Sequence, residues 1–284
     1  MPELPEVETV RRALARHVTG RTVRSVWLSG LALRKPVPPR LARNLRGRTV
    51  RDVRRHGKFL LVDLDDGARV VAHLGMTGHF TFHAKDPGPP SRLAPHTHAL
   101  LRFEDGAALT YEDPRRFGML DWAPAGVPDA KAIGATGAGV DPLAERIDGE
   151  RLRKVFAGCR GPIKHLLLDQ KRIAGIGNIY ASEALFRAGI APRRRVHTLR
   201  PDERERLARE IHAVIDHAVE HRGTTFSDFR DLDDRPGTYG TSLLVYDRES
   251  EPCTRCGTPI KRFVQTGRST YWCPTCQRRE PKRS

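Results

Sequence analysis

The chain begins Met1-Pro-Glu-Leu-Pro-Glu-Val-Glu-Thr-Val-Arg-Arg12, and the rest of the fold is organised around this stretch. Val7, Val10, Leu14 and Val18 follow one another at spacings of three and four residues. This periodicity predicts an amphipathic helix over residues 4–19 that stops at Gly20. A chain terminus normally frays, so a helix packed on a sheet would hold it in place.

Pro2 becomes the terminal residue once Met1 is removed. A terminal proline is a secondary amine with an ordinary pKa of about 8, so part of it is neutral near pH 7. Such an amine can attack a sugar carbon and leave an iminium. Glu3 beside it can move protons. From this pair alone, an inert, trimmed terminus is the competing interpretation.

The composition predicts a two-domain globular protein with a polyanionic partner. The 284 residues include 50 Lys and Arg against 34 Asp and Glu, a net charge of +16. This excess favours nucleic acid, with a generally basic surface as the alternative. No apolar stretch approaches the roughly 20 residues of a membrane span, and no signal-peptide pattern opens the chain. We therefore expect a cytoplasmic protein whose five cysteines do not form disulfides.

The first 122 residues carry a series of short strand-like runs that predict a β-sandwich with one helix. Hairpin turns are expected at Asp65-Asp66-Gly67 and at Glu104-Asp105-Gly106. The predicted strands are Thr22–Leu28, Thr49–Arg54, Phe59–Leu64, Arg69–Leu74, His98–Phe103, Leu109–Tyr111 and Met119–Trp122.

The second half of the chain is predicted to be helical. Residues 123–142 are rich in Pro, Gly and Ala and indicate an interdomain linker. Helical patterns follow at Ile163–Gln170, at Ile179–Ala188 and from Pro201 onward. We therefore expect a catalytic sandwich domain over 1–122, a helical domain over 143–248 and a metal-binding finger over 249–284.

Two CxxC pairs, Cys253/Cys256 and Cys273/Cys276, are separated by 16 residues. Four thiolates at this spacing are typical of one tetrahedral, structural zinc ion with no open coordination position. Unligated or redox-active cysteines are the alternative. Cys159 is left over and is predicted to be a buried neutral thiol.

Residues 169–191 contain the string Gly175-Ile-Gly-Asn178 ahead of a helix. The glycines permit close backbone approach, and Asn178 is expected to be the N-cap of the helix. Unpaired N–H groups at such a helix start can hold a phosphate oxygen. A plain glycine turn between packed helices would explain the same residues.

Together these motifs resemble those of the bacterial formamidopyrimidine-DNA glycosylases, the Fpg/Nei family of glycosylase and AP lyase enzymes, over essentially the whole chain. The resemblance rests on the N-terminal string, Gly57–Leu61, His73–Gly78, Asp113–Gly118, residues 169–191 and the finger. It implies an α+β fold: an N-terminal β-sandwich with one helix, then a helical domain with a helix–two-turns–helix element and a zinc finger.

The resemblance also implies roles for individual residues. The catalytic ones are Pro2 as nucleophile, Glu3 as proton donor, and Lys58 and Arg268 beside phosphates, with Glu6 supporting the site. In isolation, Lys58 and Arg268 could equally be solvated charges. The DNA-contacting residues are Met76, Arg115 and Phe117 as a wedge that fills the vacated stack, together with His96, Asn178 and Arg160. Cys159 could replace Arg160 in that register, and Met76 and Phe117 could instead be core residues.

The implied function is excision of oxidised purines, such as 8-oxoguanine and formamidopyrimidines, from duplex DNA by a zinc-containing monomer. The alternatives are an endonuclease VIII-like enzyme for oxidised pyrimidines and a non-catalytic zinc-ribbon DNA-binding protein. Base choice is expected to depend on the loop that begins at Gly223-Thr-Thr-Phe-Ser-Asp-Phe-Arg230, which is followed by a segment only loosely like the family pattern.

Overall fold

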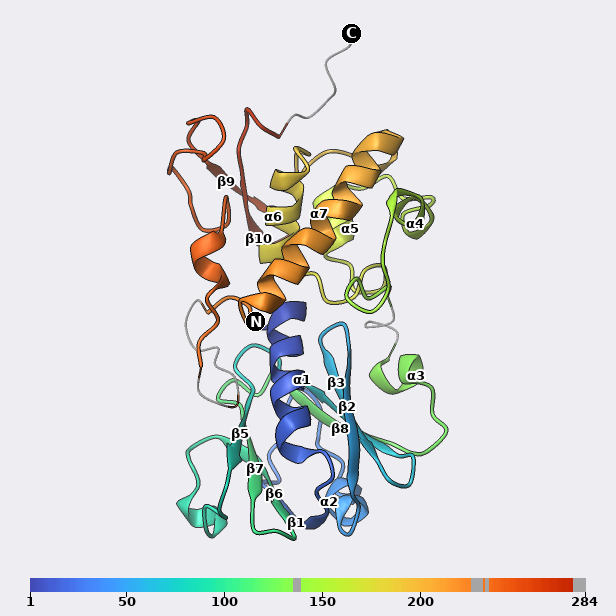
Figure 1. Cartoon of the computed structure of the whole chain (residues 1–284), viewed down its shortest axis with the longest axis vertical. Helices are drawn as coiled ribbons and strands as arrows, with labels where there is room; N and C mark the ends of the chain where they lie inside the picture. The colour runs from blue at the N-terminus through green and yellow to red at the C-terminus, as the bar shows by residue number, and fades with distance from the viewer. Residues whose placement is uncertain (135–138, 226–231, 233–234, 278–284) are drawn as a thin grey trace. The chain divides into compact units, whose positions relative to one another are not determined.

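The computed structural model describes residues 1–134, 139–225, 232 and 235–277 (Figure 1). The chain divides into two compact units. Unit 1 comprises residues 1–137 and 221–238, and unit 2 comprises residues 138–220 and 239–284. The loop predicted to choose the base begins in unit 1, but most of it lies outside the described residues.

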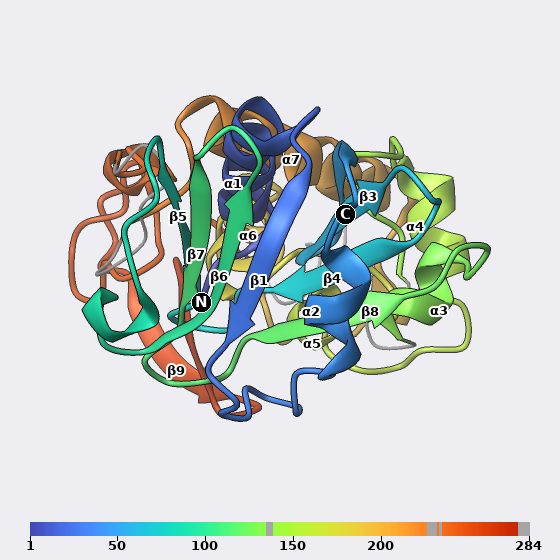
Figure 2. The same ribbon diagram turned by 90° about the horizontal axis from the view of Figure 1, so that it is seen from below.

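Unit 1 is built on two four-stranded antiparallel sheets. The first sheet has the order β1-β6-β7-β5, and Figure 2 shows these strands side by side. The second has the order β2-β3-β4-β8. The strands are β1 (Val23–Leu28), β2 (Val50–His56), β3 (Phe59–Leu64), β4 (Arg69–His73), β5 (His79–His83), β6 (Thr97–Phe103), β7 (Ala108–Glu112) and β8 (Met119–Ala123). The predicted sandwich is confirmed, and both predicted hairpin turns join paired strands.

Helix α1 (Leu4–Val18) is the predicted N-terminal helix, and its apolar face joins the sandwich core. Val7, Val10 and Leu14 are each at most 2% exposed and pack with side chains from both sheets. Two short helices, α2 (Arg40–Leu45) and α3 (Asp129–Ile133), have no counterpart in the sequence prediction, nor has β5. Helix α3 lies inside the segment predicted to be a linker.

A nearly buried ion pair attaches α1 to the second sheet. The Arg55 side chain on β2 donates to the Glu8 carboxylate at 3.2 Å, and the two side chains are 4% and 8% exposed. Arg11 and Arg12 bind the same carboxylate from the helix, and these hydrogen bonds lower the pKa of Glu8 against the opposing effect of burial. The position of the chain terminus therefore depends on a charge network as well as on apolar packing.

Unit 2 combines helices with a two-stranded hairpin. The helices are α4 (Gly149–Val155), α5 (Ile163–Leu167), α6 (Asn178–Arg187) and α7 (Pro201–Glu220), and the hairpin is β9 (Lys261–Gln265) with β10 (Arg268–Trp272). Helix α4 was not predicted, while α5, α6 and α7 match the three predicted helices. No helix among the described residues is long and apolar enough to cross a membrane.

We expect Glu8→Ala to lower the free energy of unfolding by about 3 kcal/mol, because it leaves the Arg55 guanidinium buried without its carboxylate. Thermal and urea unfolding of the purified protein measure this loss. Glu150→Ala is the matched control, since it removes an exposed carboxylate that pairs with Arg153, and such pairs contribute little. Equal stability of the two variants would contradict the structural role of Glu8.

Candidate nucleic-acid interface and metal site

The chain terminus is held by the carboxylate of Glu6, which is 2% exposed. One oxygen of Glu6 accepts the N–H of Glu3 at 2.8 Å, and the Glu3 side chain accepts the N–H of Glu6 in return. The other Glu6 oxygen accepts the N–H of Thr224 at 2.7 Å. Pro2 is buried directly before this capping box. The predicted nucleophile and proton donor thus sit on a fixed, not a frayed, end of the chain.

Lys58 lies in the two-residue turn between β2 and β3 and is only 5% exposed. Its neighbour Phe59 pairs with His73 across β3 and β4. Burial, together with the charges of Lys58 and Arg34, lowers the pKa of His73 to about 4. The predicted lysine is therefore part of a packed, positively charged environment and not a solvated edge residue.

His73 also shapes the turn that carries Met76. Its Nδ1 accepts the N–H of Gly75 at 2.9 Å, which requires a neutral imidazole with its proton on Nε2. Protonation at acid pH would remove this acceptor.

We expect His73 to make stability pH-dependent between about pH 6.5 and pH 4. The unfolded imidazole binds a proton as pH falls through 6.5, whereas the folded one resists protonation until about pH 4. The stabilising contribution of neutral His73 is therefore complete above pH 6.5, and the free energy of unfolding falls by about 3 kcal/mol as the pH is lowered toward 4. His73→Asn keeps an acceptor for Gly75 and does not titrate, so the difference in stability between parent and variant should change with pH. A constant difference from pH 7 to pH 4 would exclude this effect.

Met76 and Phe117 are exposed, at 41% and 47%, so they are not core residues. The Arg115 guanidinium lies 4.8 Å from the centre of the Phe117 ring. A flexible thioether, a ring and a guanidinium thus project from two loops of the same unit. These are groups that can fill a gap in a base stack.

The two loops are joined by Asp113, which is fully buried. One of its oxygens accepts the hydroxyl of Thr77 at 2.6 Å and the other accepts the N–H of Gly118 at 2.7 Å. Gly75 has φ +64°, and a Cβ there would come within 2.4 Å of the Phe117 backbone. The Met76 turn and the Phe117 loop therefore touch backbone to backbone.

His96 belongs to the same cluster of loops. Its carbonyl accepts the N–H of Asp113 at 3.0 Å, its φ is +67° and its side chain is exposed. The structure thus brings together Met76, His96, Arg115 and Phe117 in unit 1.

Asn178 in unit 2 differs from its predicted role. Gly177 is the N-cap of α6, and Asn178 is the first helical residue. Its Nδ2 donates to the carbonyl of Ser269 at 2.9 Å, and Lys164 Nζ donates to the same carbonyl at 3.2 Å. The N-cap prediction is wrong because the tertiary contact to β10 takes the side chain away from the helix start.

This contact fixes the hairpin tip. Lys164 also donates to the Thr270 hydroxyl at 2.8 Å, so α5 and α6 both bind the residues that follow Arg268. Arg268 itself is exposed at the start of β10.

Arg160 is exposed, whereas Cys159 is half-buried and its thiol approaches the Ala157 carbonyl at 3.8 Å. Cys159 is thus not the fully buried thiol that the sequence predicts. Of the two, only Arg160 presents a cation to solvent.

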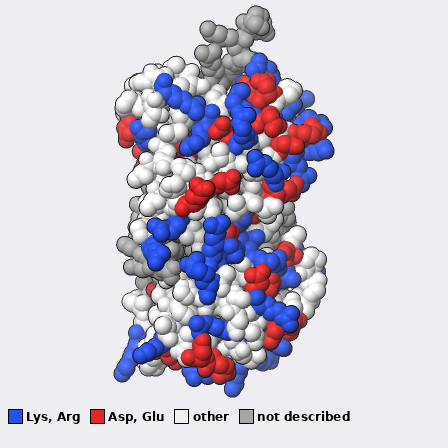
Figure 3. All heavy atoms as spheres, in the orientation of Figure 1, with Lys and Arg blue, Asp and Glu red and all other residues white. Residues whose placement is uncertain are grey.

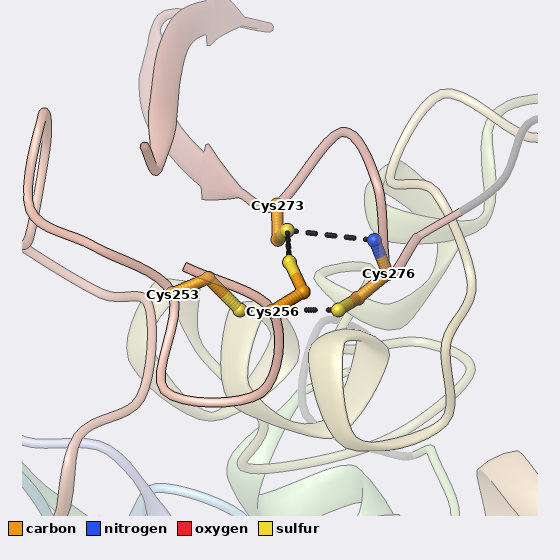
Figure 4. A group of neighbouring side chains, drawn as sticks. All are labelled: Cys253, Cys256, Cys273 and Cys276. Atoms are coloured by element: carbon orange, nitrogen blue, oxygen red, sulfur yellow. Dashed lines mark hydrogen bonds between the residues drawn. The ribbon is translucent and has the colours of Figure 1, made fainter. Parts of the chain in front are cut away.

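The four cysteines of the two CxxC pairs converge (Figure 4). All four sulfur atoms lie within 4.8 Å of one another, with Cys253 to Cys276 at 3.8 Å and Cys256 to Cys273 at 3.5 Å. Ligands about 2.3 Å from a tetrahedral zinc ion would stand roughly 3.8 Å apart. The donor set and its spacing fit one zinc ion with four protein ligands, as predicted.

The finger is attached to α6. Phe186 packs with Cys253 and Cys273 in one apolar cluster, and the Arg255 guanidinium lies 4.6 Å from the centre of its ring. Glu183 is fully buried and accepts three backbone N–H groups from residues 244–246, each at 2.9 Å. Burial raises the pKa of Glu183. The metal site, helix α6 and the Arg268 hairpin therefore form one packed body.

We expect Cys273→Ser to abolish stoichiometric zinc and to release the hairpin, since this small cluster has little apolar core besides the metal site. Zinc content by atomic absorption and the melting temperature are the measurements. Cys159→Ser, which lies outside the sulfur cluster, should keep one zinc per chain. Full zinc content in Cys273→Ser would contradict the four-sulfur site.

Several residues that build these sites were missed by sequence reasoning. Asp113, Thr77, Lys164 and Glu183 act through contacts with residues distant in the sequence. One sequence signal could have indicated such a residue: a charged side chain within an apolar helical run, as for Lys164 in Ile163–Leu167.

Three family models match the chain. They are described as the formamidopyrimidine-DNA glycosylase N-terminal domain over residues 1–120, its H2TH domain over residues 138–230, and a zinc finger found in FPG and IleRS over residues 250–279.

Individual relatives are similar over their full length. A formamidopyrimidine-DNA glycosylase of Beijerinckia indica is 44% identical, covering 98% of this chain and 100% of its own. The crystal structure of the MutM (FPG) protein from Thermus thermophilus is 43% identical with a TM-score of 0.84, covering 97% of this chain and 98% of its own. A variant of the Lactococcus lactis FPG protein in complex with DNA containing Fapy-dG is 30% identical with a TM-score of 0.86, covering 97% and 99%.

Proposed function

This chain belongs to the formamidopyrimidine-DNA glycosylase family, and we propose that it excises oxidised purines from duplex DNA and then cuts the resulting abasic strand. The observation that carries the proposal is the fixed terminus, where a capping box and the Thr224 N–H hold Pro2 and Glu3 before α1. A substrate containing Fapy-dG in a similar protein supports the purine class.

The chemistry starts at the Pro2 nitrogen, freed by removal of Met1. Its lone pair forms a bond to C1′ of the damaged nucleotide, while Glu3 gives a proton to the sugar ring oxygen. The C1′–base bond breaks, and the base leaves with the bonding electron pair and takes up the proton that the Pro2 nitrogen loses. The C1′–O4′ bond then breaks as O4′ is protonated, which opens the sugar and leaves an iminium between Pro2 and C1′. No oxidant or reductant is needed.

Strand cleavage follows from the charge of that iminium. The cation acidifies the C2′ proton, so loss of this proton expels the 3′ phosphate, and a second elimination expels the 5′ phosphate. Both leaving groups are anions that nearby cations stabilise. We assign this role to Lys58 in unit 1 and to Arg268 in unit 2.

The exposed wedge explains how a base inside a duplex becomes accessible. Extruding a nucleotide costs a few kcal/mol unless other groups fill the vacated stack. Met76 and Phe117 supply apolar volume, and Arg115 can hydrogen-bond the orphaned base. His96, Arg160 and Asn178 are assigned to the DNA backbone.

A protein that acts in this way works where chromosomal DNA lies, in the cytoplasm.

We expect protein lacking Met1, incubated with an 8-oxoguanine duplex and borohydride, to become covalently joined to the DNA through its N-terminal peptide. Peptide mapping by mass spectrometry identifies the attached residue. A form extended before Pro2 has an acylated nitrogen whose lone pair is delocalised into the amide. That form should bind the duplex and give no adduct.

Equal trapping of the extended form would identify a different nucleophile, Lys58 first. A panel of lesions run in parallel tests the substrate class. Preferred trapping on oxidised pyrimidines would indicate an endonuclease VIII-like enzyme, and binding without cleavage of any lesion would indicate a non-catalytic protein.

A further inference from the structure

Unit 2 contains a basic groove of about 530 Å³ between the α4–α5 connection, the α6–α7 connection and strand β9. It is lined by Arg160, Gly161, Pro162, Arg193, Arg195, Val264 and Gln265. We propose that this groove binds phosphodiester groups of the DNA backbone, with Arg193 and Arg195 as phosphate contacts beyond the residues named above. The proposal rests on the proposed function, since it extends the DNA-binding surface of the same protein.

The groove has a fixed backbone frame. The N–H of Ile163 donates to the Arg194 carbonyl at 2.8 Å, and the N–H of Val196 donates to the Gly161 carbonyl at 3.1 Å. The two connections therefore run as a short antiparallel ribbon, on which Pro162 and Arg195 pair. Cations mounted on such a ribbon keep their spacing.

Three consecutive arginines divide between the interior and the groove. The Arg194 side chain is 3% exposed and binds the Glu203 carboxylate through two nitrogens at 2.6 and 2.8 Å. Arg193 and Arg195 on either side of it are exposed. The buried pair anchors the segment, so its neighbours are presented to solvent.

Arg193 is held in position by an aromatic ring. Its guanidinium lies 3.9 Å from the centre of the Phe263 ring on β9, and Phe263 packs edge-on against Trp272 at 6.2 Å. Stacking leaves the N–H groups at the guanidinium edge available to an acceptor while limiting side-chain motion. Less conformational entropy is then lost when an anion binds.

The groove has uncompensated positive charge. Within the described residues, Arg160, Arg193 and Arg195 take part in no ion pair, and no carboxylate lines the groove. The amide nitrogen and oxygen of Gln265 are buried without a hydrogen-bond partner in the same part of the structure. Three guanidinium groups match the acceptor oxygens of phosphate. Figure 3 shows Lys and Arg beside Asp and Glu over the upper and lower parts of one face.

The hairpin connects the groove to the proposed DNA site. Gln265 is the direct strand partner of Arg268, and Val264 beside it is 62% exposed. DNA carries a phosphate about every 3.4 Å of axis on each strand, so a duplex bound at Arg268 brings several phosphates past β9. This favours the DNA backbone over a free anion as the occupant.

The test is the salt dependence of binding to a duplex with an uncleavable abasic analogue. Each phosphate neutralised contributes a slope of about −0.9 in log K against log salt concentration, so Arg193→Ala/Arg195→Ala should flatten the slope by about 1.8. Between 50 and 200 mM salt, the affinity advantage of the parent over this variant should shrink about tenfold. Arg195→Ala alone, which leaves the Phe263 stack intact, should give about half the change in slope.

Two controls separate a phosphate contact from general charge. Arg193→Lys/Arg195→Lys keeps both cations and should retain most of the parent slope. Arg43→Ala/Arg46→Ala removes two exposed cations from unit 1, one in α2 and one directly after it, and should leave the slope near that of the parent. If the double alanine variant fails to fold, the Arg195→Ala and lysine variants decide the question.

The proposal would be overturned if Arg195→Ala and the folded double alanine variant both showed the same salt dependence of binding as the parent protein. An equal flattening of the slope in the Arg43→Ala/Arg46→Ala control would also overturn it. So would a parent protein whose melting temperature rises with inorganic phosphate but not with duplex DNA. The proposed function is tested separately by cleavage with the parent protein. A parent that cleaves 8-oxoguanine duplexes while the variants keep its slope refutes only the groove.

Discussion

The two hydrogen bonds accepted by the Glu6 carboxylate are the constraint on which the proposed chemistry depends. One bond holds the N–H of Glu3 and the other holds the N–H of Thr224, more than two hundred residues away in the chain. A terminal amine can act as a nucleophile only if it stays near one place, and chain ends usually do not. The Glu8–Arg55 pair fixes the same helix two residues later. Gly223 is required beside Glu6, because a Cβ there would lie 2.6 Å from the carboxylate. The start of the 223–240 loop and the terminus are therefore positioned by one side chain.

Buried polar side chains that bind backbone groups recur at each proposed site. Buried Asp113 joins the Met76 turn to the Phe117 loop, and buried Lys164, together with the half-buried Asn178, joins the Arg268 hairpin to two helices. Glu183 does the same for the segment ahead of the finger. A buried carboxylate or ammonium is costly unless its hydrogen bonds are satisfied, so each of these groups defines a single loop arrangement. The exposed residues that would contact DNA are thus carried by loops whose backbones are fixed from inside.

The two units hold their functional side chains in place by different means. Unit 1 carries Lys58 and the proposed wedge residues in turns between strands, over a shared apolar core. Unit 2 has a smaller apolar cluster at the finger, and four sulfur atoms that fit zinc complete it. Arginines in unit 2 act both as buried anchors and as exposed cations: Arg194 is buried in an ion pair, while Arg193 and Arg195 are exposed. Net charge alone would not distinguish these arginines, since only their burial and partners differ.

Features of this protein that depend on local pattern can be predicted from its residues alone. Helix α1 and seven of the eight sandwich strands were predicted from periodicity and turn residues, because these signals lie within a few residues of one another. The four cysteines were predicted as metal ligands from the spacing of two CxxC pairs. The wedge role of Met76, Arg115 and Phe117 came from the family resemblance and stays a prediction, while the structure shows that Met76 and Phe117 are exposed. Strand β5 was missed although His79–His83 alternates polar residues with Phe80 and Phe82, a period-two pattern that indicates a half-buried strand. Three features became visible only in the folded chain: Asn178 binds Ser269 instead of capping its helix, Asp113 joins two loops, and Arg193 stacks on Phe263. Asn178 and Ser269 are 91 positions apart in the chain, and Asp113 and Thr77 are 36 apart. The energy of such contacts depends on burial and geometry, which no local pattern contains.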